Sequence, residues 1–157
     1  IHRLLVGVAG EIRQALAVHF GARVQIVDQP DAPAMRAALA ALPRSQHGAG
    51  LVQPGGRHAL VVVADAPAAQ LDVATFQGFV DALLAQGGVG EVDYVHGDAA
   101  LAQLASEEGC AGLHLATLGK SELIGRVARH GPLPRKSFSM GEADEKRFYL
   151  EARRIRS

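Results

Sequence analysis

Apolar and polar positions along the chain follow two alternating periods, which predicts strands interleaved with helices. Runs of continuous or alternating apolar residues predict strands, and they cover residues 1–6, 23–28, 47–53, 58–64, 91–96 and 113–118. Stretches with an apolar residue every three to four positions predict helices, and they cover 11–20, 31–42, 72–84, 98–109 and 121–130. No internal repeat is evident along this series.

The connections between the predicted strands indicate the type of sheet. Pro54-Gly55-Gly56 separates two strands and predicts an antiparallel hairpin. The second arm is continuously apolar over residues 60–63, which is typical of a central strand. The remaining strands are joined through helices, and such crossovers favour parallel neighbours. We therefore expect a single α/β domain over residues 1–157, with a mixed, mostly parallel sheet, flanking helices and one antiparallel hairpin.

Composition narrows the class of protein. Cys110 is the only cysteine, so an internal disulfide is excluded and a reducing compartment is favoured. No apolar run is long enough to span a bilayer, so the sequence predicts a cytoplasmic protein without a membrane partner. The chain opens inside a strand, and we expect it to be the C-terminal part of a longer protein.

Charge is balanced overall but unevenly distributed. Residues 126–157 contain nine Lys/Arg against four Asp/Glu, while residues 1–125 contain seven against twelve. The segment 131–157 is therefore predicted to be an extended basic tail, which either docks on its own acidic body or meets a phosphate or a partner. A net charge of zero and an aromatic content of 4% give no indication of nucleic-acid binding.

Two groups of side chains are candidates for ligand binding. Arg135, Lys136 and Ser137 place two cations and a hydroxyl beside Pro132 and Pro134, where the chain cannot be helical. The simpler interpretation is an exposed basic loop.

His96 and Asp98 form the second candidate, because they lie between a strand end and a helix start, where α/β folds place binding sites. Asp98 as a plain helix cap is the alternative, as for Asp31 and Asp72. The seven histidines show no metal-ligand spacing, so no metal site is predicted.

Four short motifs, in their order and spacing, resemble the C-terminal half of the family catalogued as domain of unknown function 1015. The motifs are His2-Arg3-Leu4, Leu71-Asp72-Val73, Val92-Asp93-Tyr94 leading to Asp98, and Leu133-Pro134-Arg135-Lys136-Ser137-Phe138. Members of that family carry an upstream half similar to ParB or sulfiredoxin-like proteins, and some relatives of that half phosphorylate free L-serine.

The resemblance implies a small-molecule phosphotransferase using ATP or ADP with Mg²⁺, of which this chain is the C-terminal subdomain. Arg135 and Lys136 would stabilise phosphoryl oxygens and Ser137 would donate a hydrogen bond, while the N-terminal half of the same protein would supply the base and the metal ligands. This segment alone would then be inactive. The alternative function is a non-catalytic structural or regulatory module that docks the rest of its parent protein.

Overall fold

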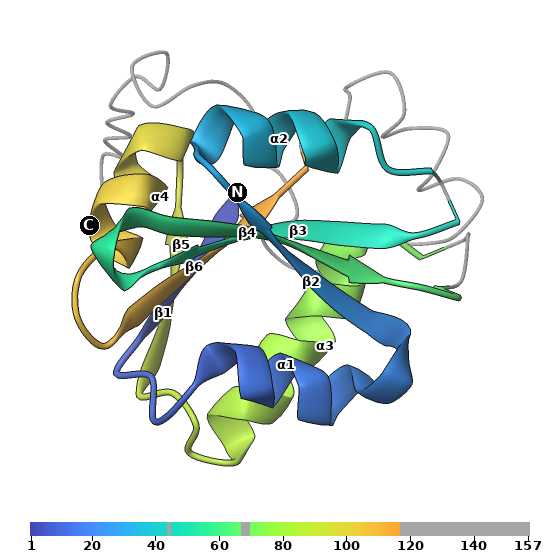
Figure 1. Ribbon diagram of the computed structural model, residues 1–157. Helices are drawn as coiled ribbons and strands as arrows, with labels where there is room; N and C mark the ends of the chain where they lie inside the picture. Colours follow the sequence, from blue (N-terminus) through green and yellow to red (C-terminus); the bar gives the residue numbers. More distant parts are fainter. Residues whose placement is uncertain (44, 67–69, 117–157) are drawn as a thin grey trace, which may run out of the picture.

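The structure, a computed structural model, describes residues 1–43, 45–66 and 70–116 (Figure 1). The strands are β1 (His2–Val6), β2 (Val24–Gln29), β3 (His47–Gln53), β4 (Arg57–Val63), β5 (Glu91–Val95) and β6 (Cys110–Leu115). The α-helices are α1 (Ile12–Phe20), α2 (Ala32–Ala40), α3 (Asp72–Ala85) and α4 (Asp98–Ala105), and short 3-10 turns cover Gly21–Arg23 and Pro54–Gly56. The predicted helix 121–130 and the basic tail 131–157 lie outside the described residues.

The strands form one six-stranded sheet in the order β2-β4-β3-β6-β1-β5. Every pairing is antiparallel, so the expectation of a mostly parallel sheet is wrong. A helical crossover fixes the relative direction of the two strands that it joins, but not whether they are neighbours. Helix α2 joins β2 to β3 with β4 inserted between them, and α4 joins β5 to β6 with β1 inserted between them.

The β3–β4 hairpin is confirmed, and β4 is an interior strand as predicted. Its turn contains Gly55 and Gly56 at φ values of +74° and +70°, a backbone region that glycine adopts at little cost. Asp31 caps α2 as expected, because its carboxylate accepts a hydrogen bond of 2.7 Å from the Ala34 amide.

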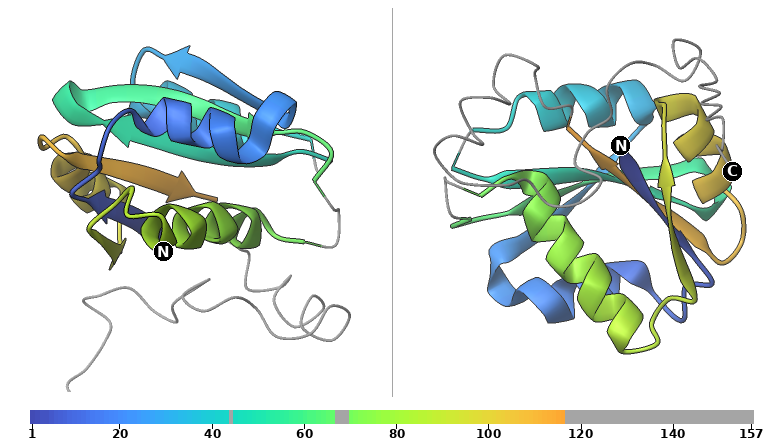
Figure 2. Two further views of the ribbon diagram at one scale, coloured as in Figure 1. Left: turned by 90° about the horizontal axis from the view of Figure 1, so that it is seen from below. Right: turned by 180° about the vertical axis from the view of Figure 1, so that it is seen from behind.

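The helices cover both faces of the sheet, giving three layers (Figures 1 and 2). Helices α1 and α3 lie over the largest apolar cluster, which includes Leu5, Phe76 and Leu113. Helices α2 and α4 cover the other face through smaller clusters around Leu4 and Leu60. No helix in the described part of the chain has the length and apolar character needed to cross a membrane.

The sheet consists of two halves with the same topology, related by a pseudo-two-fold axis between β3 and β6. One half runs β2-α2-β3-β4-α3, and the other runs β5-α4-β6 and then β1-α1. The order of strands from either edge of the sheet to its centre is therefore the same in both halves. The second half begins near the end of the described chain and finishes at its start, so the repeat is circularly permuted. For this reason the two halves do not appear as consecutive similar segments in the sequence.

The hydrogen-bond registers of the two halves superpose residue by residue. The matched pairs are Leu4–Gly112 with Leu60–Gly50, and His2–Val95 with His58–Gln29. In each half the helix begins three residues after the edge strand ends. The tripeptide Ala-Gly-Leu occurs at corresponding positions, 49–51 and 111–113.

Candidate functional site

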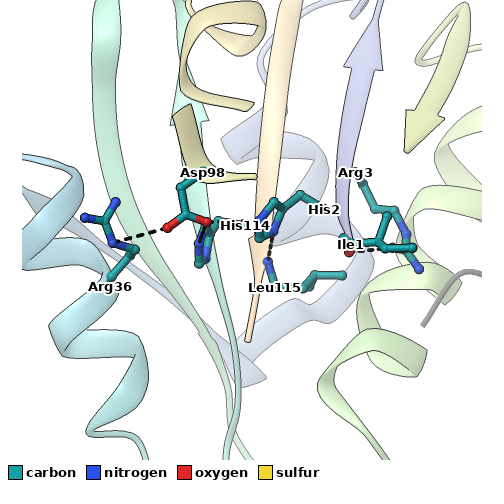
Figure 3. A network of polar contacts seen from close by, with 7 residues as sticks. All are labelled: Ile1, His2, Arg3, Arg36, Asp98, His114 and Leu115. Carbon is teal, nitrogen blue, oxygen red and sulfur yellow. Dashed lines mark hydrogen bonds and ion pairs between the residues drawn. The ribbon is translucent and has the colours of Figure 1, made fainter. Parts of the chain in front are cut away.

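A polar cluster lies on the α2/α4 face, where the start of β1, the end of β6 and the start of α4 meet (Figure 3). It consists of His2, Arg36, Asp98 and His114, and we call it the Asp98 cluster. The pairing of Arg3 with Leu113 places His2 directly opposite His114. Side chains alternate along a strand, so Arg3 points to the opposite face, where it bonds Gln77 of α3.

The carboxylate of Asp98 is the centre of this cluster. Its Oδ1 atom lies 3.2 Å from His2 Nε2 and 3.0 Å from His114 Nε2. Its Oδ2 atom lies 3.5 Å from Arg36 Nε. The two imidazole rings stack with centroids 4.2 Å apart.

The contacts of the rings determine where their protons lie. The Leu115 amide donates to His2 Nδ1 at 3.1 Å, so neutral His2 carries its proton on Nε2 and donates it to Asp98. His114 Nε2 faces the same carboxylate oxygen and must also donate. Its Nδ1 atom is then an acceptor, and it is buried without a hydrogen-bond partner among the described residues.

The surroundings shift the pKa values of two of these groups. Burial, with a smaller effect of His114, lowers the pKa of His2 to about 4 despite the nearby carboxylate. Partial burial alone would raise the pKa of Asp98, but His114, His2 and Arg36 together bring it below its usual value. At neutral pH the cluster therefore contains an ionised carboxylate, a guanidinium and a neutral His2.

Two imidazoles and a carboxylate also form a donor set that transition metals use. The ligand atoms of His2, Asp98 and His114 all lie within 4.8 Å of one another. However, the two stacked rings are only 22° from parallel, so one ion cannot lie in the planes of both.

The proton positions oppose a metal as well. A metal on His2 Nε2 would move the proton to Nδ1, where it would face the Leu115 amide. The residues as arranged do not fit a metal held by both imidazoles.

The structure brings only part of the predicted site together. Asp98 belongs to the cluster, but it is the first helical residue of α4 rather than its cap, a position that Gly97 holds. Asp72 is likewise inside α3, after Leu71, so both cap predictions are wrong.

His96 follows β5 and is half-buried. Within the described ranges, no hydrogen bond or ion pair joins it to the cluster. Arg135, Lys136 and Ser137 lie outside these ranges, and the anion site stays a prediction.

Sequence reasoning missed His2, Arg36 and His114. His2 is 96 residues from Asp98, and only the pairing of β1 with β6 brings the two histidines together. The sequence contained one indication of their orientation. His2 lies two positions before Leu4, and His114 lies two positions after Gly112, so each histidine faces the same side of its strand as that neighbour. Comparison with known proteins finds no matching family model, curated protein or solved structure, so the resemblance described above also stays a prediction.

Proposed function

We propose that the Asp98 cluster binds a small molecule carrying a hydroxyl group, and that His114 Nδ1 accepts the hydroxyl proton. The observation that carries the proposal is the buried Nδ1 acceptor without a partner in the described structure. Buried polar atoms are nearly always hydrogen-bonded, and a ligand hydroxyl is the kind of donor that this atom lacks. Asp98 fixes the tautomer and stabilises the imidazolium that forms.

The other half of the sheet supports a ligand role, because it builds the same local architecture without the cluster. The positions that correspond to His2, His114 and Asp98 are His58, Val52 and Ala32. At the matched positions that half has Ala32 in place of the carboxylate and Val52 in place of the second histidine, although Asp31 caps its helix and His47 begins its inner strand. The strand pair and the helix start therefore do not require these side chains.

The charged groups of the cluster are exposed to solvent, whereas its imidazole rings are buried. The side chains of Arg36 and Asp98 are 40% and 47% exposed, whereas that of His114 is 11% exposed. The carboxylate and the guanidinium thus border the site, with the imidazole beneath them. A small polar molecule binding here would meet the charged groups first, and His114 Nδ1 would have to become accessible when it binds.

Accepting a proton from an alcohol is one of the tasks of a protein in phosphoryl transfer. In the proposed reaction, the hydroxyl oxygen bonds to the terminal phosphorus of a nucleotide, the bond to the bridging oxygen breaks, and the proton passes to His114. This assigns the chain to one side of a phosphotransferase site and gives His114 the role of base that the resemblance places in the N-terminal half. ATP or ADP, Mg²⁺ and the N-terminal half would supply the other side. Arg135, Lys136 and Ser137 keep the proposed role of binding phosphoryl oxygens.

A structural or regulatory module is the second candidate, and the burial of both rings favours it. His2 and His114 are 6% and 9% exposed, and the cluster ties β1 and β6 to α4. In this interpretation the cluster stabilises the position of β1 and binds no ligand. In either case we propose a cytoplasmic location, because the single Cys110 fits a reducing compartment.

Titration calorimetry of the full chain with free L-serine, alone and with ATP and Mg²⁺, tests the proposal. Binding should be lost in His114→Val and Asp98→Ala, which introduce the residues that the other half has at these positions. His58→Val is the matched control and should bind as the wild type does. Absence of binding, or equal binding by His114→Val, would contradict the ligand role; a lower unfolding free energy in the same variants would then favour the structural module.

A further inference from the structure

A second group of polar side chains lies on the opposite face of the sheet, where β3 begins and α3 starts. His47 is the first residue of β3, and Asp72 and Thr75 lie in the first turn of α3. The His47 Nδ1 atom lies 2.7 Å from Thr75 Oγ1. Its Nε2 atom lies 3.9 Å from Asp72 Oδ1. These residues are separate from the Asp98 cluster.

The Asp72 carboxylate favours one tautomer of His47. A lone pair on Nε2 would face the Asp72 carboxylate and be repelled, whereas an N–H at that atom is attracted. The Nδ1 atom then carries the lone pair and accepts the hydrogen bond from the Thr75 hydroxyl. A hydroxyl, an imidazole base and a carboxylate thus stand in the order that activates an oxygen nucleophile.

Burial and helix position support this order. His47 is 2% exposed, so its orientation is fixed by the surrounding core. Thr75 is only partly buried, and the Asp72 side chain is 32% exposed, so both residues border solvent. Helix α3 has 14 residues, and the field at its N-terminus favours negative charge developing near Thr75.

We propose that Thr75 is a nucleophile that accepts an acyl group from an activated ester. Its Oγ1 atom attacks the carbonyl carbon while its proton passes to His47 Nδ1. The carbon–oxygen bond to the leaving alcohol then breaks, and that alcohol takes the proton from His47. The product is an ester on Thr75, and Asp72 stabilises the imidazolium between the two steps.

The probe for this proposal is p-nitrophenyl acetate, with the full chain as the reactant. We expect an acetyl group on Thr75, mapped by peptide mass spectrometry, together with release of one equivalent of p-nitrophenolate. His47→Gln should slow this reaction about a hundred-fold, the usual contribution of a general base. Thr75→Ser should keep the reaction and Thr75→Val should abolish it.

Ser106 is a matched control within the same chain. Ser106 is partly buried, as Thr75 is, and its hydroxyl donates to the Gln103 carbonyl oxygen at 2.7 Å, so it is not bonded to a base among the described residues. Circular dichroism of His47→Gln separates loss of reactivity from loss of folding, and Thr75→Val keeps the shape of the side chain. Labelling of Ser106 at the rate of Thr75, or an unchanged phenolate release in Thr75→Val, would overturn the proposal. Either result would leave the proposed ligand binding by the Asp98 cluster unaffected.

Discussion

At the scale of single residues, His2 is neutral because its ring is buried and its Nδ1 atom accepts a hydrogen bond from the Leu115 amide. The ring accepts from the Leu115 amide and donates to Asp98, so it uses both nitrogens without carrying a charge. Protonation would place a hydrogen on Nδ1 facing the Leu115 amide. This conflict adds to the cost of burying a cation.

The stability of the protein should therefore fall between pH 6.5 and pH 4. The pKa of His2 drops from 6.5 to about 4 on folding, so the unfolded chain binds this proton first as the pH decreases. The loss is at most about 3 kcal/mol, by the conversion of a pKa difference into free energy. Urea denaturation of the wild type and of His2→Gln, each at pH 7 and pH 4.5, measures it.

The variant should lose less unfolding free energy than the wild type over this interval, because it lacks the titrating ring. His58→Gln provides the control, since it removes a histidine at the corresponding position of the other half. Equal losses in the wild type and His2→Gln would show that His2 does not cause the dependence.

The chemistry of Asp98 could be predicted only in part at this scale. Its place after a strand identified it as a candidate, whereas its interpretation as a helix cap was wrong. The decisive information is the identity of its partners: two are histidines from the first and last described strands, and the third is Arg36 of α2. Local sequence patterns determine which way a residue faces, but they do not determine which distant strand lies beside it.

At the scale of elements, most helices and strands were predicted near their observed bounds, because each has a clear apolar period. Two elements differ more: the helix expected at 98–109 ends at Ala105, and the strand expected at 113–118 spans Cys110–Leu115. The glycines in and before this strand obscured its start. Strand neighbours were harder to predict than strands, because β4 and β1 are inserted between strands that helices connect.

Two glycines allow the helices of the α2/α4 face to approach the sheet, and they should differ in their tolerance of a methyl group. A Cβ atom on Gly112 would lie 2.8 Å from Ala105 Cβ and 3.0 Å from Leu101 Cδ1. One on Gly50 would lie 2.6 Å from the Met35 sulfur. The Ala105 methyl is fixed to the backbone, whereas the long Met35 side chain can move aside.

Gly112→Ala should lower the free energy of unfolding by about 1–3 kcal/mol, the usual cost of overpacking a core. Gly50→Ala should cost less, and it serves as the matched variant because Gly50 occupies the corresponding position in the other half. Thermal or urea denaturation of both variants measures the difference. An equal or larger loss in Gly50→Ala would contradict this account of the two contacts.

At the scale of the whole molecule, the two halves share one core. The cluster under α1 and α3 contains Leu5 and Leu113 from one half, and Leu51 and Val61 from the other. The strands of the two halves also pair directly, from Ala49 with Leu115 to Val52 with Gly112. Neither half can bury its apolar face without the other.

We therefore expect the two halves to unfold in one cooperative transition. Hydrogen exchange followed by mass spectrometry at increasing urea should show peptides from β3–β4 and from β1 and β6 losing protection at the same concentration. Far-UV circular dichroism should give the same midpoint. Loss of protection in one half while the other stays protected would mean that the halves are independent folding units.

The pairing of β1 with β6 also determines how this fold can be joined to other polypeptide. His2 and Leu115, near the two ends of the described chain, are in direct contact, so the backbone enters and leaves beside the Asp98 cluster. A peptide segment joined directly before Ile1 or directly after residue 116 is covalently tethered within a few residues of that cluster. Such a tether gives the segment a high effective concentration there, so even a weakly binding segment could compete with a free ligand for the cluster.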